Sequence, residues 1–161
     1  MTKNTGFTLV EVLIAMLILA VGLLGLAGLQ ATSLRNTQSA YNRSQATQLA
    51  YDMADRMRAN VADARLSVDA DPLTASAYLG AALQVANCTA VAGCTPAQMA
   101  QNDLFEWNQD IDNALSASAT GTIAAVPVLA PTGFTITITW DDNRDDNVDA
   151  ADPNFQMRFQ L

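Results

Sequence analysis

Near its N-terminus the chain reads Gly6-Phe7-Thr8-Leu9-Val10-Glu11 and then continues as an unbroken apolar run over residues 12–29. The run contains only Val, Leu, Ile, Ala, Met and Gly, and no charged residue lies between Glu11 and Arg35. At about 1.5 Å per residue, a helix of this length covers most of the ~30 Å hydrocarbon core of a bilayer. The sequence therefore predicts a membrane-spanning helix at the start of the chain.

Glu11 places an ionisable carboxylate at the head of this helix, where a charge is costly without a partner. A six-residue leader precedes Phe7, and Glu11 is the fifth residue counted from Phe7. In these features the segment resembles the class III prepilin signal of type IV pilins and pseudopilins. The resemblance implies that a prepilin peptidase cuts after Gly6 and methylates the new amine of Phe7. It also implies that Glu11 docks a neighbouring subunit by pairing with that subunit's Phe7 amine.

Two alternatives to a prepilin remain open. A secretory signal peptide, with Lys3 as its charged region, requires a shorter apolar stretch that ends at a small-residue cleavage site. The best such site, Gly25-Leu26-Ala27, lies inside the run, and Glu11 interrupts the start of the stretch. An ordinary single-span anchor is the second alternative.

Charge is distributed unevenly along the 161 residues. Residues 1–65 hold six Lys or Arg and four Asp or Glu (+2), whereas residues 66–161 hold two Arg and twelve acids (−10), which together give the net charge of −8. An acidic surface repels phosphate backbones, because nucleic-acid binding rests largely on basic side chains. We therefore expect no nucleic-acid partner, which disfavours a DNA-uptake pilin.

The chain has no histidine and two cysteines, Cys88 and Cys94. The usual general base for a Ser or Cys nucleophile is therefore missing, and no Cys/His set can complete a zinc tetrahedron. We expect no catalytic residues and no enzyme, and a membrane-anchored periplasmic enzyme is the alternative class. If the part of the chain after the membrane span is exported, the two cysteines are expected to form a disulfide that closes a short loop. Two free thiols are the alternative.

Two helices are predicted from periodicity and capping. Apolar residues recur with helical spacing after residue 30, so the first helix is expected to continue to about Asn60. The recurring residues are Leu34, Tyr41, Leu49, Met53 and Met57, with alanines at 46, 50 and 54. From Tyr41 to Met57 this stripe is expected to pack against the head. Asp52 and Arg56 lie four residues apart, in the order that favours an ion pair.

Thr95-Pro96-Ala97-Gln98 has the pattern of a capping box and predicts a second helix. On this helix Trp107 is expected in the core, and the polar face takes Asp103, Glu106, Asp110 and Asp112.

Strands are predicted in the last third of the chain. Residues 134–140 and 155–161 alternate between apolar and polar side chains, which is typical of half-buried strands. We expect them to pair antiparallel, with their apolar faces turned onto a helix. Residues 122–129 are rich in β-formers, and Pro127 would place a strand there at a sheet edge.

The loop over residues 141–152 has acids or Asn at the ligand offsets of an EF-hand calcium loop. The candidate ligands are Asp141, Asn143, Asp145, Asn147, Asp149 and Asp152. Two departures weaken the match, because Asp146 replaces the turn glycine and Asp152 replaces the closing glutamate. A solvated acidic hairpin loop is the alternative. No other cofactor or metal is expected.

Residues 34–60, and above all Ala50-Tyr51-Asp52-Met53-Ala54-Asp55-Arg56-Met57-Arg58-Ala59-Asn60, resemble the PilV family of minor pilins, the type IV pilus modification proteins. The resemblance implies a minor pilin that joins other minor and major pilins to prime pilus assembly, in a complex at the filament tip and beside a tip adhesin. It also implies a bacterial inner-membrane protein with a cytoplasmic N-terminus and a periplasmic head, which later enters the pilus. A minor pseudopilin of a type II secretion system is the runner-up.

The expected fold class is α+β and type IV pilin-like, with a long N-terminal helix packed on a small C-terminal head. The head carries an antiparallel β-sheet and a second helix. The expected divisions are a leader over residues 1–6, a transmembrane half of the helix over 7–30, an amphipathic half over 31–60, and the globular head over 61–161.

Overall fold

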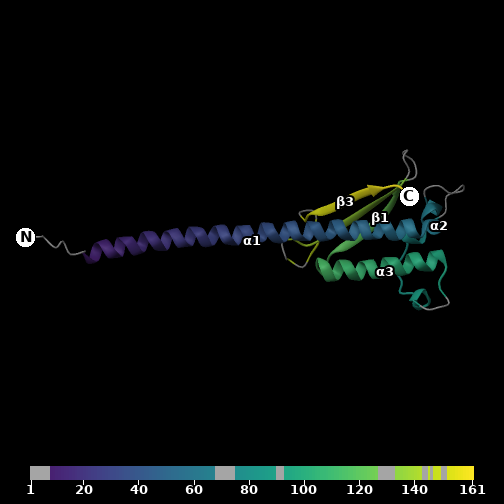
Figure 1. Ribbon diagram of the computed structural model, residues 1–161, viewed down its shortest axis with the longest axis horizontal. Coiled ribbons are helices and arrows are strands. Elements are labelled where there is room, and N and C mark those ends of the chain that lie inside the picture. Colours follow the sequence, from purple (N-terminus) through teal and green to yellow (C-terminus); the bar gives the residue numbers. More distant parts are fainter. Residues whose placement is uncertain are drawn as a thin grey trace, which may run out of the picture. The chain divides into compact units, whose positions relative to one another are not determined.

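The structure is a computed structural model, and it describes residues 8–67, 75–89, 93–126, 133–142, 145, 147–149 and 152–161. The helices in these residues are α1 (Leu9–Ala59), α2 (Val61–Ala64) and α3 (Pro96–Ala114), with the short 3-10 helices η1 (Arg65–Ser67), η2 (Ala77–Leu79) and η3 (Ala86–Thr89). The strands are β1 (Thr120–Val126), β2 (Gly133–Thr139) and β3 (Asn154–Phe159) (Figure 1). A long N-terminal helix, a second helix and a small antiparallel sheet confirm the predicted α+β class.

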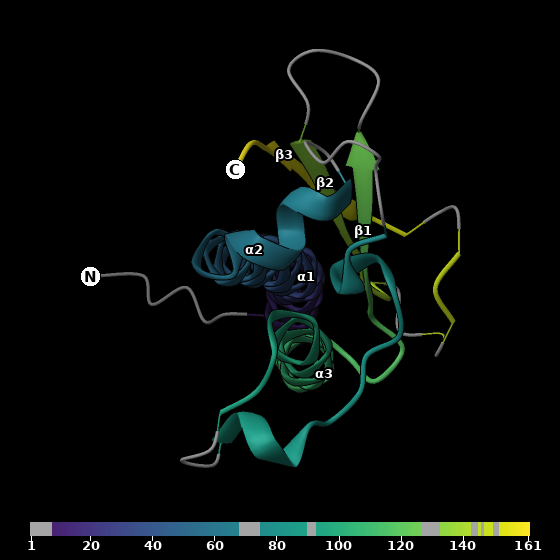
Figure 2. The same cartoon turned by 90° about the vertical axis from the view of Figure 1, so that its right-hand side faces the viewer.

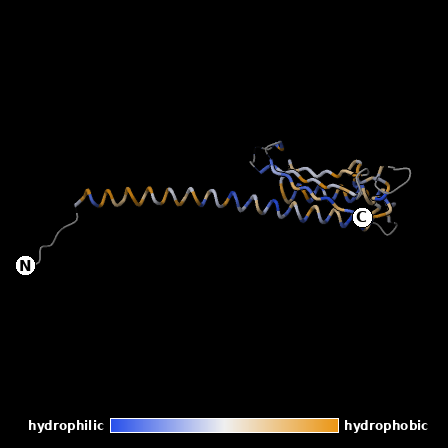
Figure 3. Tube along the Cα trace, turned by 90° about the horizontal axis from the view of Figure 1, so that it is seen from above, coloured by the Kyte–Doolittle hydropathy of each residue, from blue (hydrophilic) through white to orange (hydrophobic). Residues whose placement is uncertain are grey.

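The chain divides into two compact units, Met1–Ala40 and Tyr41–Leu161. In the first unit α1 begins after Thr8, because the amide of Glu11 donates to the carbonyl and hydroxyl oxygens of Thr8 at 3.1 and 3.3 Å. The apolar side chains of residues 9–29 are exposed, and Figure 3 shows this part of the helix as almost uniformly hydrophobic. Helix α1 is long and apolar enough to cross a membrane, by length and composition.

In the second unit α1 contributes a buried stripe of small and flexible side chains to the core. The stripe consists of Ala46, Ala50, Met53, Ala54 and Met57, each fully buried. The predicted stripe was wrong at its N-terminal end, because Tyr41 is 55% exposed. One turn before the buried Ala46 the stripe reaches Asn42, which is buried, and this leaves Tyr41 about 100° away around the helix.

The sheet has the strand order β1-β2-β3, and both pairs of neighbours are antiparallel. Ile136 of the central strand lies opposite Ile123 of β1 and Met157 of β3. The inward residues of β2, Phe134, Ile136 and Ile138, are fully buried. The predicted antiparallel pairing of the last two strands is therefore confirmed. The predicted first strand is present as an edge strand, whereas its predicted part at residues 127–129 lies outside the described residues.

Helix α3 and the second-unit part of α1 lie on the same side of the sheet (Figure 2). The capping box of α3 is confirmed, because the Thr95 hydroxyl accepts from the Gln98 amide and the Gln98 side chain accepts from the Thr95 amide. Trp107 is fully buried as predicted, and its indole N–H donates to the carbonyl of Leu49 on α1 at 2.9 Å. Gly121 of β1 leaves room for this ring, since a Cβ there would collide with Trp107.

Candidate functional site

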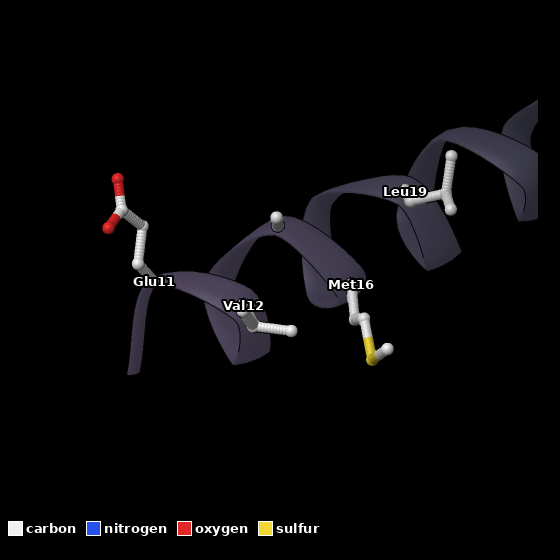
Figure 4. A pocket seen from close by; sticks show the side chains of 5 residues that line it. Glu11, Val12, Met16 and Leu19 are labelled. Atoms are coloured by element: carbon white, nitrogen blue, oxygen red, sulfur yellow. The ribbon is translucent and has the colours of Figure 1, made fainter. Parts of the chain in front are cut away.

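Glu11 lies in the first turn of α1 and is exposed. Figure 4 shows its carboxylate directed away from Val12 and Met16. A shallow groove along this turn is lined by Glu11 and by Val12, Ala15, Met16 and Leu19, so every lining residue except Glu11 is apolar. The segment therefore presents one anionic group at the head of a long apolar surface.

Within the part of the chain that the structure describes, no Lys or Arg forms an ion pair with Glu11. The first turn of a helix favours a carboxylate, because the free backbone N–H groups carry partial positive charge. That effect is worth about 0.3–1 kcal/mol on an exposed surface and does not replace a full cation. Gly6 and Phe7, the predicted cleavage and methylation sites, lie outside the described residues. The cleavage, methylation and docking roles stay predictions.

Cys88 and Cys94 form the predicted disulfide, with their Cα atoms 4.8 Å apart. The alternative of two free thiols is therefore wrong. Cys94 directly precedes Thr95, whose side chain caps α3. The disulfide thus closes a short loop just before the second helix begins.

Two carboxylates of the acidic loop, those of Asp145 and Asp152, accept hydrogen bonds from backbone amides of the loop itself. Asp152 accepts from the amides of Asp142 and Asp149 at 3.2 and 2.9 Å, and Asp145 accepts from the amide of Asn147 at 3.0 Å. Among the described residues, no three His, Cys, Asp or Glu side chains are grouped to hold a metal ion. Asn143 lies outside these residues, and calcium binding stays a prediction.

A charged cluster joins α1 to α3 around Arg56, whose side chain is 24% exposed. Its guanidinium lies 2.8 Å from Asp52, as predicted, and 2.8 Å from Glu106 on α3. It also lies 3.8 Å from Asp103 and 3.6 Å from Asp110. Burial acts to lower the pKa of Arg56, but its hydrogen bonds to Glu106 and Asp52 outweigh burial, and the pKa lies above its usual value. One cation thus holds four carboxylates together.

The prediction for Asp103, a member of this cluster, was wrong. Asp103 was expected on the polar face of α3, and it is buried. The hydroxyl of Tyr78 donates to its carboxylate at 2.5 Å. Burial raises the pKa of Asp103, although the Tyr78 hydrogen bond and the Arg56 charge act in the opposite direction. Burial, followed by the hydrogen bond to Asp103, also raises the pKa of Tyr78 far above its usual range.

Tyr78 reaches Asp103 because η2 is fixed to α2. Asp63 accepts from the hydroxyl of Ser76 at 2.6 Å and from the amide of Ala77 at 2.9 Å. Ser76 in turn caps η2 by accepting from the amide of Tyr78. No local periodicity predicts this contact, since Tyr78 and Asp103 are 25 residues apart and meet only in the folded head.

Comparison with known protein families gives two matches. Residues 1–27 match the prokaryotic N-terminal methylation motif, the segment that contains Gly6, Phe7 and Glu11. Residues 28–105 match the family described as Type IV pilin Tt1218. Together the two matches cover residues 1–105 and indicate a type IV pilin. No curated protein and no solved structure matches it.

This pilin is therefore a structural subunit of a pilus or pseudopilus. Its methylation motif implies processing by a prepilin peptidase and assembly with other pilins. The same motif, together with the apolar N-terminal helix, indicates membrane anchoring before assembly.

Proposed function

We propose that this pilin is a minor pilin of the PilV type that primes assembly of a type IV pilus, in a complex of minor pilins at the tip and beside a tip adhesin. The observation that carries the proposal is the exposed carboxylate of Glu11 at the head of an uncharged, exposed apolar helix. The sequence resemblance of residues 34–60 to the PilV family supports the minor role.

In the proposed pathway the subunit first waits in the inner membrane. The leader, with Lys3, stays on the cytoplasmic side while α1 spans the bilayer and the head enters the periplasm. Prepilin peptidase then cuts between Gly6 and Phe7 and methylates the Phe7 amine.

Docking then depends on Glu11. A charged residue in the apolar part of a membrane costs about 2.5–3.5 kcal/mol on insertion scales. The Phe7 amine of the same chain precedes Glu11 by only four residues in the sequence, and we treat it as an imperfect partner. A neighbouring subunit that presents its own Phe7 amine relieves both charges, and this selects one axial register between the two helices.

The experiment compares Glu11→Ala and Glu11→Gln with the wild type in cells that assemble the filament. Asp112→Asn is the matched control, because it removes one exposed carboxylate from α3. We expect both Glu11 variants to be expressed, inserted and cleaved normally but depleted at least tenfold from sheared filaments. The control should be recovered at the wild-type level.

Intact-mass analysis of the membrane-extracted protein reports processing separately. We expect the loss of residues 1–6 and the gain of one methyl group. Recovery of the Glu11 variants in filaments at the wild-type level would contradict the docking role. A wild-type subunit that is absent from pili, and whose deletion blocks protein secretion, would identify a pseudopilin instead.

A further inference from the structure

A small cavity lies between the end of α1 and the start of α3, within the second unit. It has a volume of about 270 Å³ and is open to solvent. Its lining includes two charged side chains, Arg56 and Asp103, and the apolar surfaces of Ala59, Pro96 and Met99. Pockets that enclose a drug-sized ligand have volumes of about 300–1,000 Å³, so the size of this cavity suits a single side chain better than a larger molecule. We call it the Asp103 cavity.

The carboxylate of Asp103 has one oxygen that accepts a hydrogen bond and one that accepts none. Its Oδ2 accepts from the hydroxyl of Tyr78 at 2.5 Å, whereas its Oδ1 lies 3.8 Å from the guanidinium of Arg56, too far for a hydrogen bond. Among the residues that the structure describes, no fully buried side-chain oxygen or nitrogen lacks a partner, so this Oδ1 is reached by solvent. Asp103 itself is only 9% exposed. The wall of the cavity therefore carries one acceptor that is free to bind a donor.

The charges around the Asp103 cavity favour a cation. The guanidinium of Arg56 is shared by four carboxylates, so one positive and four negative charges leave the cluster at −3. Two N–H groups of Arg56 are already bonded to Asp52 and Glu106. The described part of the chain holds no group of three acidic, Cys or His side chains arranged for a metal ion. Together with the apolar walls, this points to an organic cation that is carried on an apolar stem.

An ammonium group matches the free acceptor better than a guanidinium does. A guanidinium binds a carboxylate best through two parallel hydrogen bonds, which need both oxygens, and Tyr78 already occupies Oδ2 of Asp103. An ammonium is a compact charge that needs only one oxygen, and the stem of a lysine can lie along apolar walls. Lys3, in the predicted leader, is the only lysine of this chain. The head of a second copy therefore has no lysine to offer, and its charge of −10 over residues 66–161 repels a like head.

We propose that the Asp103 cavity binds a lysine side chain of a different protein. The ammonium group of that lysine donates to Oδ1 of Asp103, and its stem packs against Ala59, Pro96 and Met99. The acidic head attracts a partner surface that carries basic side chains. Glu11 takes no part in this contact, so the proposed docking step and this contact can fail independently.

The test uses the full chain in neutral detergent micelles at neutral pH, with labelled methionine methyl groups followed by NMR. The methyl group of Met99 reports on the cavity, and those of Met16 and Met157 serve as references. The probe is a capped pentapeptide with a central lysine between glycines, and the comparison peptides carry norleucine, arginine or glutamate at the centre. We expect the lysine peptide to shift the Met99 signal saturably, with a Kd in the millimolar range. The comparison peptides should bind at least fivefold more weakly, and added salt should weaken the binding of the lysine peptide.

Two variants and two controls locate the contact. Asp103→Asn removes the charge and keeps the shape of the side chain, and Asp112→Asn removes an exposed carboxylate of α3 as its control. Ala59→Leu fills the cavity without changing any charge, and Ala40→Leu makes the same substitution at an exposed position of α1. We expect Asp103→Asn and Ala59→Leu each to weaken binding of the lysine peptide at least fivefold, while both controls bind it like the wild type. Ala59→Leu keeps the test decisive if Asp103→Asn does not fold.

Four results would overturn the proposal. The first is no saturable shift of the Met99 signal by the lysine peptide up to about 100 mM, beyond the range of a single side-chain contact. The second is equal binding of the norleucine peptide, or tighter binding of the glutamate peptide, which would identify a merely apolar hole or a site for anions at Arg56. The third is unchanged binding of the lysine peptide by the folded variants. The fourth is binding of n-butylammonium without binding of the lysine peptide, which would indicate a free amine rather than a protein side chain.

Discussion

The Arg56→Met substitution tests whether the charged cluster holds α3 on α1. Met keeps an apolar stem of similar length but leaves four carboxylates without their shared cation. Asp52, Glu106 and Asp110 are 45–50% exposed, so we assign each lost pair at most about 0.5 kcal/mol. Asp103 is only 12% exposed and keeps a charge that is no longer compensated, which costs about 1–2 kcal/mol more. The expected loss of stability is about 2–3 kcal/mol.

The assay is urea unfolding of the full chain in detergent, followed by tryptophan fluorescence, because Trp107 and Trp140 are both buried in the second unit. Arg43→Met, at an exposed position of α1, is the control and should change the free energy of unfolding by less than about 0.5 kcal/mol. In an Asp103→Asn background the cost of Arg56→Met should fall to about 1 kcal/mol, because the uncompensated charge is gone. The same cost in both backgrounds, or a cost below about 0.5 kcal/mol in the wild type, would refute the reasoning.

Two further predictions concern the same core. The pKa of Asp103 in the folded state lies above its ordinary value of 3.8. At a pH between the ordinary pKa and the raised one, the folded state binds a proton that the unfolded state does not bind. The contribution of Asp103 to stability therefore grows as the pH falls through that window. The melting temperature of the wild type should therefore rise relative to that of Asp103→Asn between pH 7 and pH 4, and a constant difference would contradict the raised pKa. Trp107→Phe removes the indole bond to the Leu49 carbonyl and opens a cavity, so it should cost about 2–3 kcal/mol in urea unfolding. Tyr51→Phe, at an exposed position of α1, should stay within about 0.5 kcal/mol of the wild type, and an equal loss for both variants would show that burial of the indole is not what matters.

The fold was predictable where a local pattern determines the structure. Thr95 and Gln98 meet within one turn, so the start of α3 follows from the sequence alone. The alternation of Phe134, Ile136 and Ile138 likewise assigns the buried face of β2 without knowledge of its neighbours. The prediction for Tyr41 was wrong because its large apolar side chain was taken as a sign of burial. The buried alanines of α1 define the direction of the core, and Tyr41 lies outside that direction.

The charged cluster was predictable only in its local part. Asp52 and Arg56 lie on one helix, and their spacing predicts the 2.8 Å pair. Asp103 follows a polar pattern on α3, and its burial results from Tyr78, which reaches it from a different element. Such a contact depends on the tertiary packing of η2 against α3, and no spacing within either segment encodes it.

The exposed apolar half of α1 explains why the proposed docking step depends on one carboxylate. Lipid is as apolar as leucine, so moving the side chains of residues 12–29 from a bilayer to contacts with other pilin helices changes their hydrophobic free energy little. The difference between the two environments must then come from close packing and from polar groups. Gly22, Gly25 and Gly28 recur every three residues with open space beside them, which allows a neighbouring helix to approach closely in more than one register. Glu11 occurs once, at one end, and a cation satisfies it in a single axial position. A neutral residue there would keep the affinity of the helix for its neighbours but remove the preference for one register, which is why Glu11→Gln is expected to be processed normally and still fail to enter the filament.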